Sequence, residues 1–546
     1  MGIPWRIVLL LAACRILSGA SQAPDFDLPV DLSGAGGSTL WLALDAGQGP
    51  GSSVVELPKG QRAFLAFQAD IVLQVRGGSL AGARAYRDYR WHDIPLEGIR
   101  LSRKKGRLLV RFEKLSSPAE RRSVQWFRTT AKGIDTSGHD YFNRSAGGDV
   151  YFPTYHRVRE DGSLELRGRS GEFGAKPRIY QMLPRLFGNE NNTRKTNGTL
   201  AENGTGKFSD LSTPVLEGFR ADGFTHIWLT GILQQATSTN YSGYGQPPDD
   251  PDLLKGIAGS PYAIRDYFDV CPDYADNPAR RMEEFTALAS RMKAAGLSLL
   301  IDFVPNHVAR SYWSDIRPKL SFGRKDRQKV FFHRNNNFFY LTPEVAEGSG
   351  PLRLPSTGFD GDWSAGNADG LFDAERRHGR VTGNNVVSWT PSRGDWYETV
   401  KLNYGFDFLH PEQEPEYPSA DTPRKRVPDT WWKMDAVIAY WQGLGVDGFR
   451  VDMAHMVPPE FWKWLIYRAR QRESGVFFCA EAYNDDPAGV RSRDPAFSKS
   501  DGVALPLLDA GFDAVYDDSG YDEAKHLMEG TAWANDLDRA EAALGP

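Results

Sequence analysis

Cysteine is scarce in this chain, which has 3 cysteines in 546 residues. Such a small number excludes a fold that depends on a framework of disulfide bonds. Cys14 lies in an N-terminal apolar segment, so only Cys271 and Cys479 remain once that segment is removed. The hydrophobic content of 40% allows a sizeable core instead.

The chain also lacks an excess of charge of one sign. Its 65 basic and 70 acidic residues are interspersed, and the formal net charge is −5. Proteins that bind nucleic acid electrostatically carry a basic patch or stripe, so we expect no nucleic-acid partner here. After the N-terminus, the sequence contains no apolar run long enough to span a membrane.

The N-terminus has the layout of a secretory signal. "MGIPWRIVLLLAACRILSGASQAPDF" combines an early arginine, a short apolar run and small residues before a cleavage point. We expect residues 1–23 to be a signal peptide cut after Ala20 or Ala23, and the protein to be secreted or periplasmic. The alternative is a lipid anchor at the cell surface, because "LAAC", ending at Cys14, resembles a bacterial lipobox. Arg15 directly after this cysteine favours ordinary cleavage.

Two hydrophobic patterns divide the rest of the chain. Residues 24–175 contain short alternating runs such as "STLWLALDA" and "RLLVRFEKL", which predict an N-terminal β-rich domain. Its role is either to pack against its neighbour, which we favour, or to bind carbohydrate. Residues 176–546 instead alternate amphipathic helices with apolar strands, as in "RMEEFTALASRMKAAGLSLLIDFVPNHV". Gly296 can end that helix. The apolar face of the helix consists of Phe285, Leu288, Ala289 and Met292.

This alternation predicts an α/β fold with a parallel sheet covered by helices. A closed barrel and a doubly wound sheet both fit the pattern. Residues 308–408 interrupt it with Gly, Asp, Asn and Trp and few apolar runs. So long an irregular segment predicts an inserted subdomain on the face where the site lies.

Polar side chains stand where predicted strands end. In parallel α/β folds the reacting groups collect at the carboxyl ends of the strands. A carboxylate that ends an apolar run needs a partner or a function, because burying it unpaired is costly. The segments "LLIDFVPNHV", "GFRVDMAH" and "VFFCAEAY" supply Asp302, Asn306, His307, Arg450, Asp452, His455 and Glu481.

Asp452 and Glu481 follow consecutive predicted strands, so a closed barrel turns both toward one pocket. Glycoside hydrolysis needs such a pair, one carboxylate at the anomeric carbon and one proton donor at the leaving oxygen. Arg450 points to the same side as Asp452 and is expected to keep that carboxylate ionised. Spacing alone leaves open a purely structural Arg450–Asp302 pair, and also a metal site of carboxylates and histidines.

Four segments in order, "SPYAIRDYFDV", "DFVPNHV", "GFRVDMAH" and "AEAY", resemble the successive motifs of the α-amylase superfamily, glycoside hydrolase family 13. The resemblance runs from about residue 178 to the end. It implies a (β/α)₈ TIM barrel with an inserted subdomain after strand 3. It also implies that Asp452 is the nucleophile, that Glu481 is the general acid and then the base, and that Arg450 positions the nucleophile.

The other matched positions concern the substrate and a metal ion. By the resemblance, His307 hydrogen-bonds the sugar in the cleavage subsite and Tyr262 stacks beneath it. Asn306 matches a position that often binds calcium, and His455 one near that ion or the acceptor sugar. The reaction itself requires no cofactor. Whether a structural calcium ion is bound stays open, because the insertion that supplies the other oxygen ligands cannot be aligned.

One family motif has no counterpart. The Asn-His-Asp run at the end of the seventh strand supplies a third carboxylate, and none follows Glu481, so we expect the last two barrel strands to be missing. The resemblance implies that the complete product, with those strands, is a retaining glycoside hydrolase or transglycosylase acting on α-glucosidic bonds of α-glucans or malto-oligosaccharides. The alternative is a non-catalytic relative that binds glucan or serves as a partner subunit. Asp452 and Glu481 favour the first, and the missing carboxylate favours the second.

Overall fold

The computed structural model describes most residues from 177 to 531 and separate segments between residues 26 and 168. The gaps in the longer part are residues 356–367, 414–416, 418–425 and 483–499. The expected signal peptide and Cys14 lie outside the described residues. The chain divides into two compact units, Met1–Lys176 with Ser519–Pro546, and Pro177–Asp518.

Among the described residues, the N-terminal segment of the first unit is built from β-strands. Its largest sheet has eight strands, with β2 (Thr39–Asp45) paired antiparallel to β5 (Ile71–Arg76) and β10 (Ser123–Thr130). Alternate residues of β2 enter two different apolar cores, Leu40 in one and Trp41 in the other, because successive side chains of a strand point to opposite faces.

The other strands of this unit are β1 (Phe26–Leu28), β3 (Ser52–Glu56), β4 (Arg62–Ala69), β6 (Ser79–Arg87), β7 (Arg90–Asp93), β8 (Ile99–Lys104), β9 (Arg107–Phe112), β11 (Gly133–Asp135), β12 (Phe142–Asn143), β13 (Val150–Phe152), β14 (Thr154–Val158) and β15 (Leu164–Gly168).

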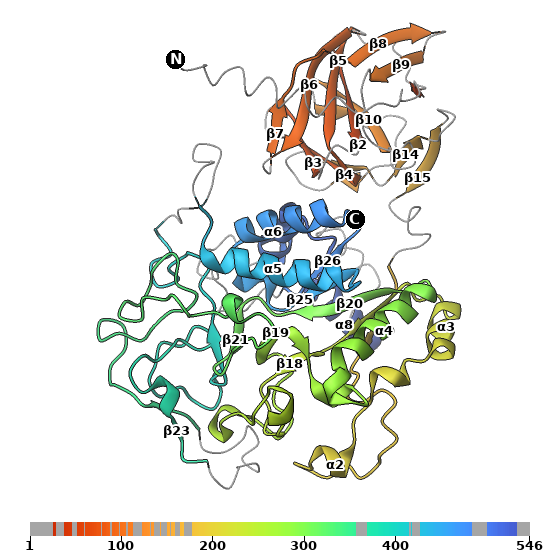
Figure 1. Cartoon of the computed structure of the whole chain (residues 1–546). Coiled ribbons are helices and arrows are strands. Elements are labelled where there is room, and N and C mark those ends of the chain that lie inside the picture. The colour runs from red at the N-terminus through yellow and green to blue at the C-terminus, as the bar shows by residue number, and fades with distance from the viewer. Residues whose placement is uncertain are drawn as a thin grey trace, which may run out of the picture. The chain divides into compact units, whose positions relative to one another are not determined.

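The second unit contains a six-stranded parallel sheet (Figure 1). Its strands pair in the order in which they follow one another along the chain, each with the next. A doubly wound sheet reverses its strand order at a switch point, whereas a β/α barrel does not, so the order identifies a barrel. The strands are β16 (Ile179–Met182), β17 (His226–Leu229), β20 (Ser298–Phe303), β25 (Gly448–Val451), β26 (Phe477–Ala480) and β27 (Ala514–Val515).

Helices precede five of these strands, as the alternating pattern predicts. In α4, the buried side chains are the four apolar residues of the predicted face, and Gly296 follows with a φ of 70°. None of the helices among the described residues combines the length and apolarity needed to cross a bilayer. The helices among the described residues are α2 (Leu200–Asn203), α3 (Thr213–Ala221), α4 (Arg281–Ala294), α5 (Asp429–Gly443), α6 (Pro459–Arg472), α7 (Ser500–Ala510) and α8 (Asp518–Met528). All of α8 except its first residue belongs to the first unit.

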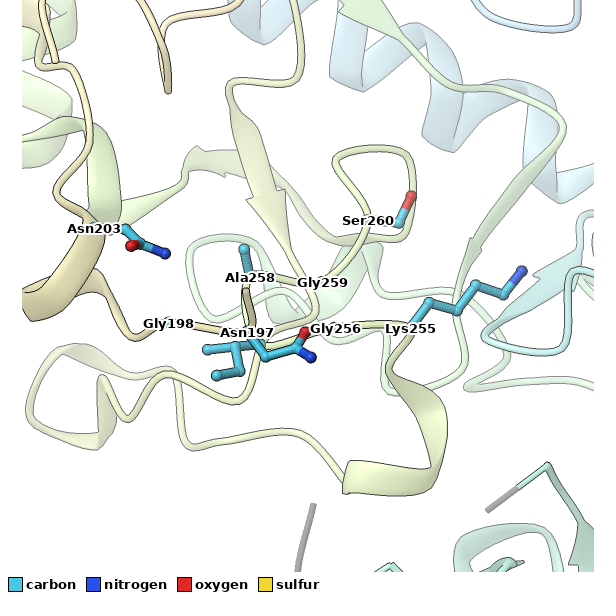
Figure 2. A pocket seen from close by; sticks show the side chains of 9 residues that line it. Asn197, Gly198, Asn203, Lys255, Gly256, Ala258, Gly259 and Ser260 are labelled. Carbon is cyan, nitrogen blue, oxygen red and sulfur yellow. The ribbon is translucent and has the colours of Figure 1, made fainter. Parts of the chain in front are cut away.

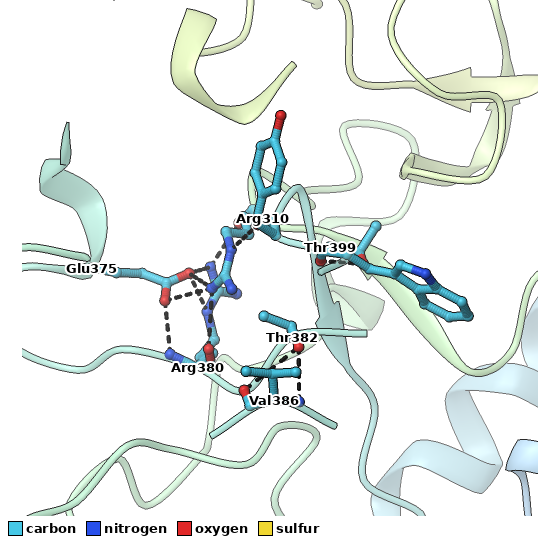
Figure 3. Close-up of polar contacts among 8 residues, drawn as sticks. Arg310, Glu375, Arg380, Thr382, Val386 and Thr399 are labelled. Atoms are coloured by element: carbon cyan, nitrogen blue, oxygen red, sulfur yellow. Dashed lines mark hydrogen bonds and ion pairs between the residues drawn. The ribbon is translucent and has the colours of Figure 1, made fainter. Parts of the chain in front are cut away.

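The insertion lies between β20, the third strand of the sheet, and α5, which confirms the expected subdomain after strand 3. It has an apolar core of its own, which includes Trp389 and Tyr397. A buried charge cluster adds to it (Figure 3): the Glu375 carboxylate binds Arg310 at 2.8 Å and Arg380 at 2.6 Å. Two short antiparallel pairs belong to the insertion, β21 (His307–Ala309) with β24 (Thr399–Lys401) and β22 (Leu352–Arg353) with β23 (Leu371–Phe372). A third pair, β18 (Leu233–Gln235) with β19 (Ile264–Val270), lies between β17 and β20 in the chain.

Candidate active site

Four consecutive strands of the barrel bring charged and aromatic side chains to their carboxyl ends. Asp302 in β20 and Arg450 in β25 are directly paired in the sheet register. Asp452 follows β25, Glu481 follows β26 and Tyr516 follows β27. Because the strands are parallel and adjacent, these side chains meet at one edge of the sheet.

The guanidinium of Arg450 is the centre of this cluster. Its Nη1 donates to Asp452 Oδ1 at 2.9 Å and to Asp302 Oδ1 at 3.3 Å, and its Nη2 lies 2.6 Å from Glu481 Oε1. Its Nε donates to the Tyr516 hydroxyl at 3.2 Å. Arg450, Asp452, Glu481 and Asp302 are 5%, 6%, 8% and 1% exposed. The Arg450–Asp302 pair left open by the sequence therefore exists, as one part of a larger cluster.

The backbone after β25 holds Glu481. Met453 adopts a left-handed conformation with a φ of 46°, and its N–H donates to Glu481 Oε2 at 2.9 Å. The next N–H, that of Ala454, donates to the Glu481 carbonyl at 2.9 Å. A left-handed backbone costs a residue other than glycine about 1–2 kcal/mol. Strain of this kind, at a residue that fixes a buried carboxylate, is typical of functional sites.

Burial raises the pKa of Asp452 well above its ordinary value, and the negative charge of Glu481 and a hydrogen bond between the two carboxyl groups act in the same direction. Arg450 lowers this pKa and so favours the ionised carboxylate, as expected from the sequence, while burial and Glu481 act against it. Burial likewise raises the pKa of Asp302 to about 6, against Arg450 and the Gly231 N–H, which donates to Asp302 at 2.7 Å. The hydrogen-bonded pair Asp452–Glu481 is therefore built to share one proton.

Aromatic rings surround the guanidinium. The Arg450 Cζ atom lies 5.1 Å from the ring centroid of Trp228, 5.7 Å from that of Tyr262 and 5.5 Å from that of Tyr516. The sequence predicted Tyr262 at the site but not Trp228 or Tyr516. Tyr516 is the last residue of "FDAVY" and directly follows its strand, so the rule that identified Asp452 and Glu481 would have identified it as well.

His307 lies close to this cluster. It is buried at the start of β21 and hydrogen-bonds the backbone of Tyr262. Burial, with the charge of Lys401, lowers the pKa of His307 to about 3, so its imidazole is neutral at physiological pH. The structure thus brings His307 and Tyr262 together, as the resemblance implied.

Asn306 directly precedes His307, and His455 follows Asp452 by three residues. The fully buried Asn306 donates from Nδ2 to the Gly383 carbonyl at 2.9 Å, and its Oδ1 accepts a short hydrogen bond from Lys401. His455 lies half-buried in the 3₁₀ helix η10 (Ala454–Met456). Over the described part of the chain, no three His, Cys, Asp or Glu side chains are grouped to hold a metal ion. The side-chain oxygen of Asn306, the atom that a metal ion would bind, accepts from the Lys401 ammonium.

A hollow of about 390 Å³ lies on the loop that leads to Tyr262 (Figure 2). It contains none of the site residues predicted from the sequence. Its last lining residue precedes Tyr262 by two positions. The lining residues are Asn197, Gly198, Asn203, Lys255, Gly256, Ile257, Ala258, Gly259 and Ser260.

Comparison with known proteins agrees with the resemblance seen in the motifs. A family model described as "Alpha amylase, catalytic domain" matches residues 181–475, more than half of the 546 residues. Maltase 1 of Drosophila virilis is 25% identical over 276 residues, which are 50% of this chain and 30% of that protein. An alpha-1,4-glucan:maltose-1-phosphate maltosyltransferase of Myxococcus xanthus (strain DK1622) is 40% identical over 53 residues, 10% of this chain and 8% of that protein.

Among solved structures, an alpha-amylase from Lactobacillus plantarum matches with a TM-score of 0.37 and 19% identity, covering 66% of this chain and 58% of that chain. In the comparison with Maltase 1, the matched part of this chain spans less than a third of that protein.

Proposed function

This chain belongs to the α-amylase family, and on that premise we propose that it is a retaining glycoside hydrolase or transglycosylase that acts on α-glucosidic bonds of α-glucans or malto-oligosaccharides. The observation that carries the proposal is the buried, hydrogen-bonded pair of Asp452 and Glu481 on one guanidinium. An inverting enzyme needs its two carboxyl groups roughly 6.5–9.5 Å apart, to leave room for water. Carboxyl groups in hydrogen-bond contact favour the retaining route.

In the proposed reaction, the Asp452 carboxylate forms a bond to the anomeric carbon while the bond from that carbon to the leaving oxygen breaks. The Glu481 carboxyl gives its proton to that oxygen. Glu481 then takes a proton from water or from a sugar hydroxyl, whose oxygen displaces Asp452 from the sugar. A pair that shares one proton suits this sequence, because one member is ionised while the other is the acid.

The neighbouring residues position these two. Arg450 orients the Asp452 carboxylate, and the Met453 N–H fixes the Glu481 carboxylate. We propose that the neutral His307 hydrogen-bonds a sugar hydroxyl, that Tyr262 stacks on the sugar ring, and that His455 lies toward the acceptor sugar. Trp228 and Tyr516 complete the aromatic wall around Arg450.

The proposal is tested with Asp452→Asn and Glu481→Gln in the full chain, assayed on malto-oligosaccharides. Each variant should lose several powers of ten in kcat while its thermal unfolding stays cooperative. Asp447→Asn is the matched control, because Asp447 lies just before β25, at the opposite end of the same strand, and binds the Leu299 N–H at 2.8 Å. It should keep its turnover. Glucan binding by the unmodified chain without any turnover would favour a non-catalytic glucan-binding protein instead.

We also propose that the protein is exported and cut after Ala20 or Ala23, because the N-terminal sequence has the layout of a signal peptide. N-terminal sequencing of the mature protein tests this. A lipid-modified Cys14 as the first residue would show the anchored form instead.

A further inference from the structure

Lys401 is a buried lysine, 3% exposed, beside the site. It is the last residue of β24 and the direct cross-strand partner of His307. Its ammonium group donates to two oxygens, the side-chain Oδ1 of Asn306 and the carbonyl of Met456, the latter at 3.2 Å. Burying an ammonium group is costly unless its N–H donors are satisfied, so we expect these two oxygens to hold the charged form of Lys401 in place.

The ammonium group connects three segments that are far apart in the sequence. Lys401 ends β24 inside the insertion, Asn306 follows the third barrel strand, and Met456 lies in the 3₁₀ helix after the fourth. Two of these segments lead directly to the site, because Asn306 precedes His307 and Met456 follows Asp452 by four residues. A cation at this point therefore ties together the loops that carry the site.

The donor set around Asn306 excludes a second cation. Calcium takes 6–8 oxygen ligands at about 2.3–2.6 Å. Asn306 has a single side-chain oxygen, and the Lys401 ammonium occupies it. The hydrogen bond from Asn306 Nδ2 to the Gly383 carbonyl at 2.9 Å fixes the amide, so that its oxygen must face the lysine. A divalent ion at this oxygen would also be repelled by the adjacent ammonium.

We propose that the Lys401 ammonium is a built-in cation that takes the place of a structural metal ion beside the site. Asn306 is then a partner of Lys401 rather than a calcium ligand, and the fold needs no divalent ion there. This inference rests on the contacts of Lys401 and not on the proposed reaction.

The first test uses the unmodified full chain. After dialysis with and without EGTA, calcium is measured by mass spectrometry and the thermal midpoint Tm is measured in EGTA and in millimolar CaCl₂. We expect no stoichiometric calcium and the same Tm in both solutions, because a ligand that binds only the folded state raises Tm by several degrees at saturation. One retained calcium ion per chain, with a Tm that falls on chelation, would overturn the proposal.

The second test compares Lys401→Met with Lys433→Met. Lys433 is a control of the same type, because it is also buried, 7% exposed, and donates to an amide oxygen, Asn337 Oδ1 at 2.7 Å, and to a carbonyl, that of Ser321 at 3.0 Å. It differs in that it also pairs with Asp429 at 2.9 Å. Both variants should have a lower Tm, in EGTA and in CaCl₂ alike. Glucan turnover should fall about tenfold or more in Lys401→Met alone, as for groups that hold a ligand residue in place.

The two measurements separate this proposal from the proposed function. Only the turnover comparison depends on the glycosidase reaction, whereas calcium content and Tm do not. A Lys401→Met chain with unchanged Tm and turnover would contradict the proposal. If that variant does not fold, the calcium content and Tm of the unmodified chain still decide it.

Discussion

A single guanidinium, that of Arg450, contacts three carboxyl groups, those of Asp302, Asp452 and Glu481. When all three are ionised, the buried cluster carries more negative than positive charge. Burial and mutual repulsion raise the pKa values of Asp302 and Asp452, so the folded protein holds protons there that the unfolded chain releases. At pH values where these carboxyl groups ionise, the cluster therefore lowers the free energy of unfolding of the protein, as functional sites often do.

This excess charge predicts a pH-dependent effect of Asp452→Asn on stability. A raised folded pKa means that the contribution of Asp452 to stability is present at low pH and is lost as the pH rises through that pKa. The substitution removes the repulsion with Glu481, so it should raise the free energy of unfolding by about 1 kcal/mol at about pH 8. The gain should shrink as the pH is lowered toward about 4.5, because the raised pKa of Asp452 favours its protonation and protonation removes the repulsion with Glu481.

Urea unfolding at both pH values measures this difference. Glu283→Gln is the control, because Glu283 lies exposed on α4 and pairs only with the exposed Arg280 among the ion pairs described. It should have little effect at either pH. A loss of stability in Asp452→Asn at pH 8 would show that Arg450 stabilises the ionised Asp452 more than burial and Glu481 oppose it.

Arg450 itself should be among the residues most sensitive to substitution. Arg450→Met removes the partner of three buried carboxyl groups and should cost about 3–5 kcal/mol of unfolding free energy at neutral pH. Arg472→Met is a control, because Arg472 binds Asp435 at 2.7 Å but is partly exposed. Its loss should be about 1 kcal/mol or less, measured by the same urea unfolding. Equal losses in the two variants would mean that the positive charge of Arg450 is not needed to balance the three buried carboxyl groups.

At the scale of elements, β25 must lie close to both of its neighbours. A Cβ atom at Gly448 would lie 2.5 Å from the Phe477 carbonyl oxygen on β26 and 2.7 Å from Leu300 Cδ2 on β20. Glycine at this position therefore lets the strand that carries Arg450 pack between β20 and β26. The requirement comes from strand packing and not from an unusual φ, since Gly448 is not among the residues with positive φ.

Gly448→Ala should consequently destabilise the barrel by about 1–3 kcal/mol. Gly443→Ala, five residues earlier at the end of α5, is the matched control, because nothing lies within 4 Å of its added Cβ atom. It should be neutral or stabilising by up to about 1 kcal/mol. Thermal unfolding of the two variants measures the difference, and a Gly448→Ala protein as stable as Gly443→Ala would contradict the packing argument.

At the scale of the whole molecule, the barrel was predictable because buried parallel strands are continuous apolar runs. "LSLLIDFV" and "GVDGFRVD" stand out for that reason, and each follows a helix with a readable apolar face. The sequence left barrel and doubly wound sheet open, because strand order is a property of pairing between distant segments. Only the observed pairing of each strand with the next decides it.

The candidate site was predictable only in part. Asp452 and Glu481 follow strand ends, and their motifs resemble a known family, so their positions were readable. Lys401 was not, because its contact with Asn306 spans 95 residues and depends on the pairing of β21 with β24 inside an insertion without periodicity. The net rise in the pKa of Asp452 was also unreadable, since it depends on the depth of burial.

The most direct test of the account is to trap the covalent intermediate on Asp452. The Glu481→Gln variant of the full chain is incubated with α-maltosyl fluoride, whose leaving group needs little protonation, so the first step proceeds while the second lacks its base. We predict that the intact mass rises by one maltosyl unit and that peptide sequencing by mass spectrometry places it on Asp452. Fluoride release without an adduct, or an adduct on another carboxylate, would contradict the assignment of Asp452 as nucleophile and Glu481 as acid and base.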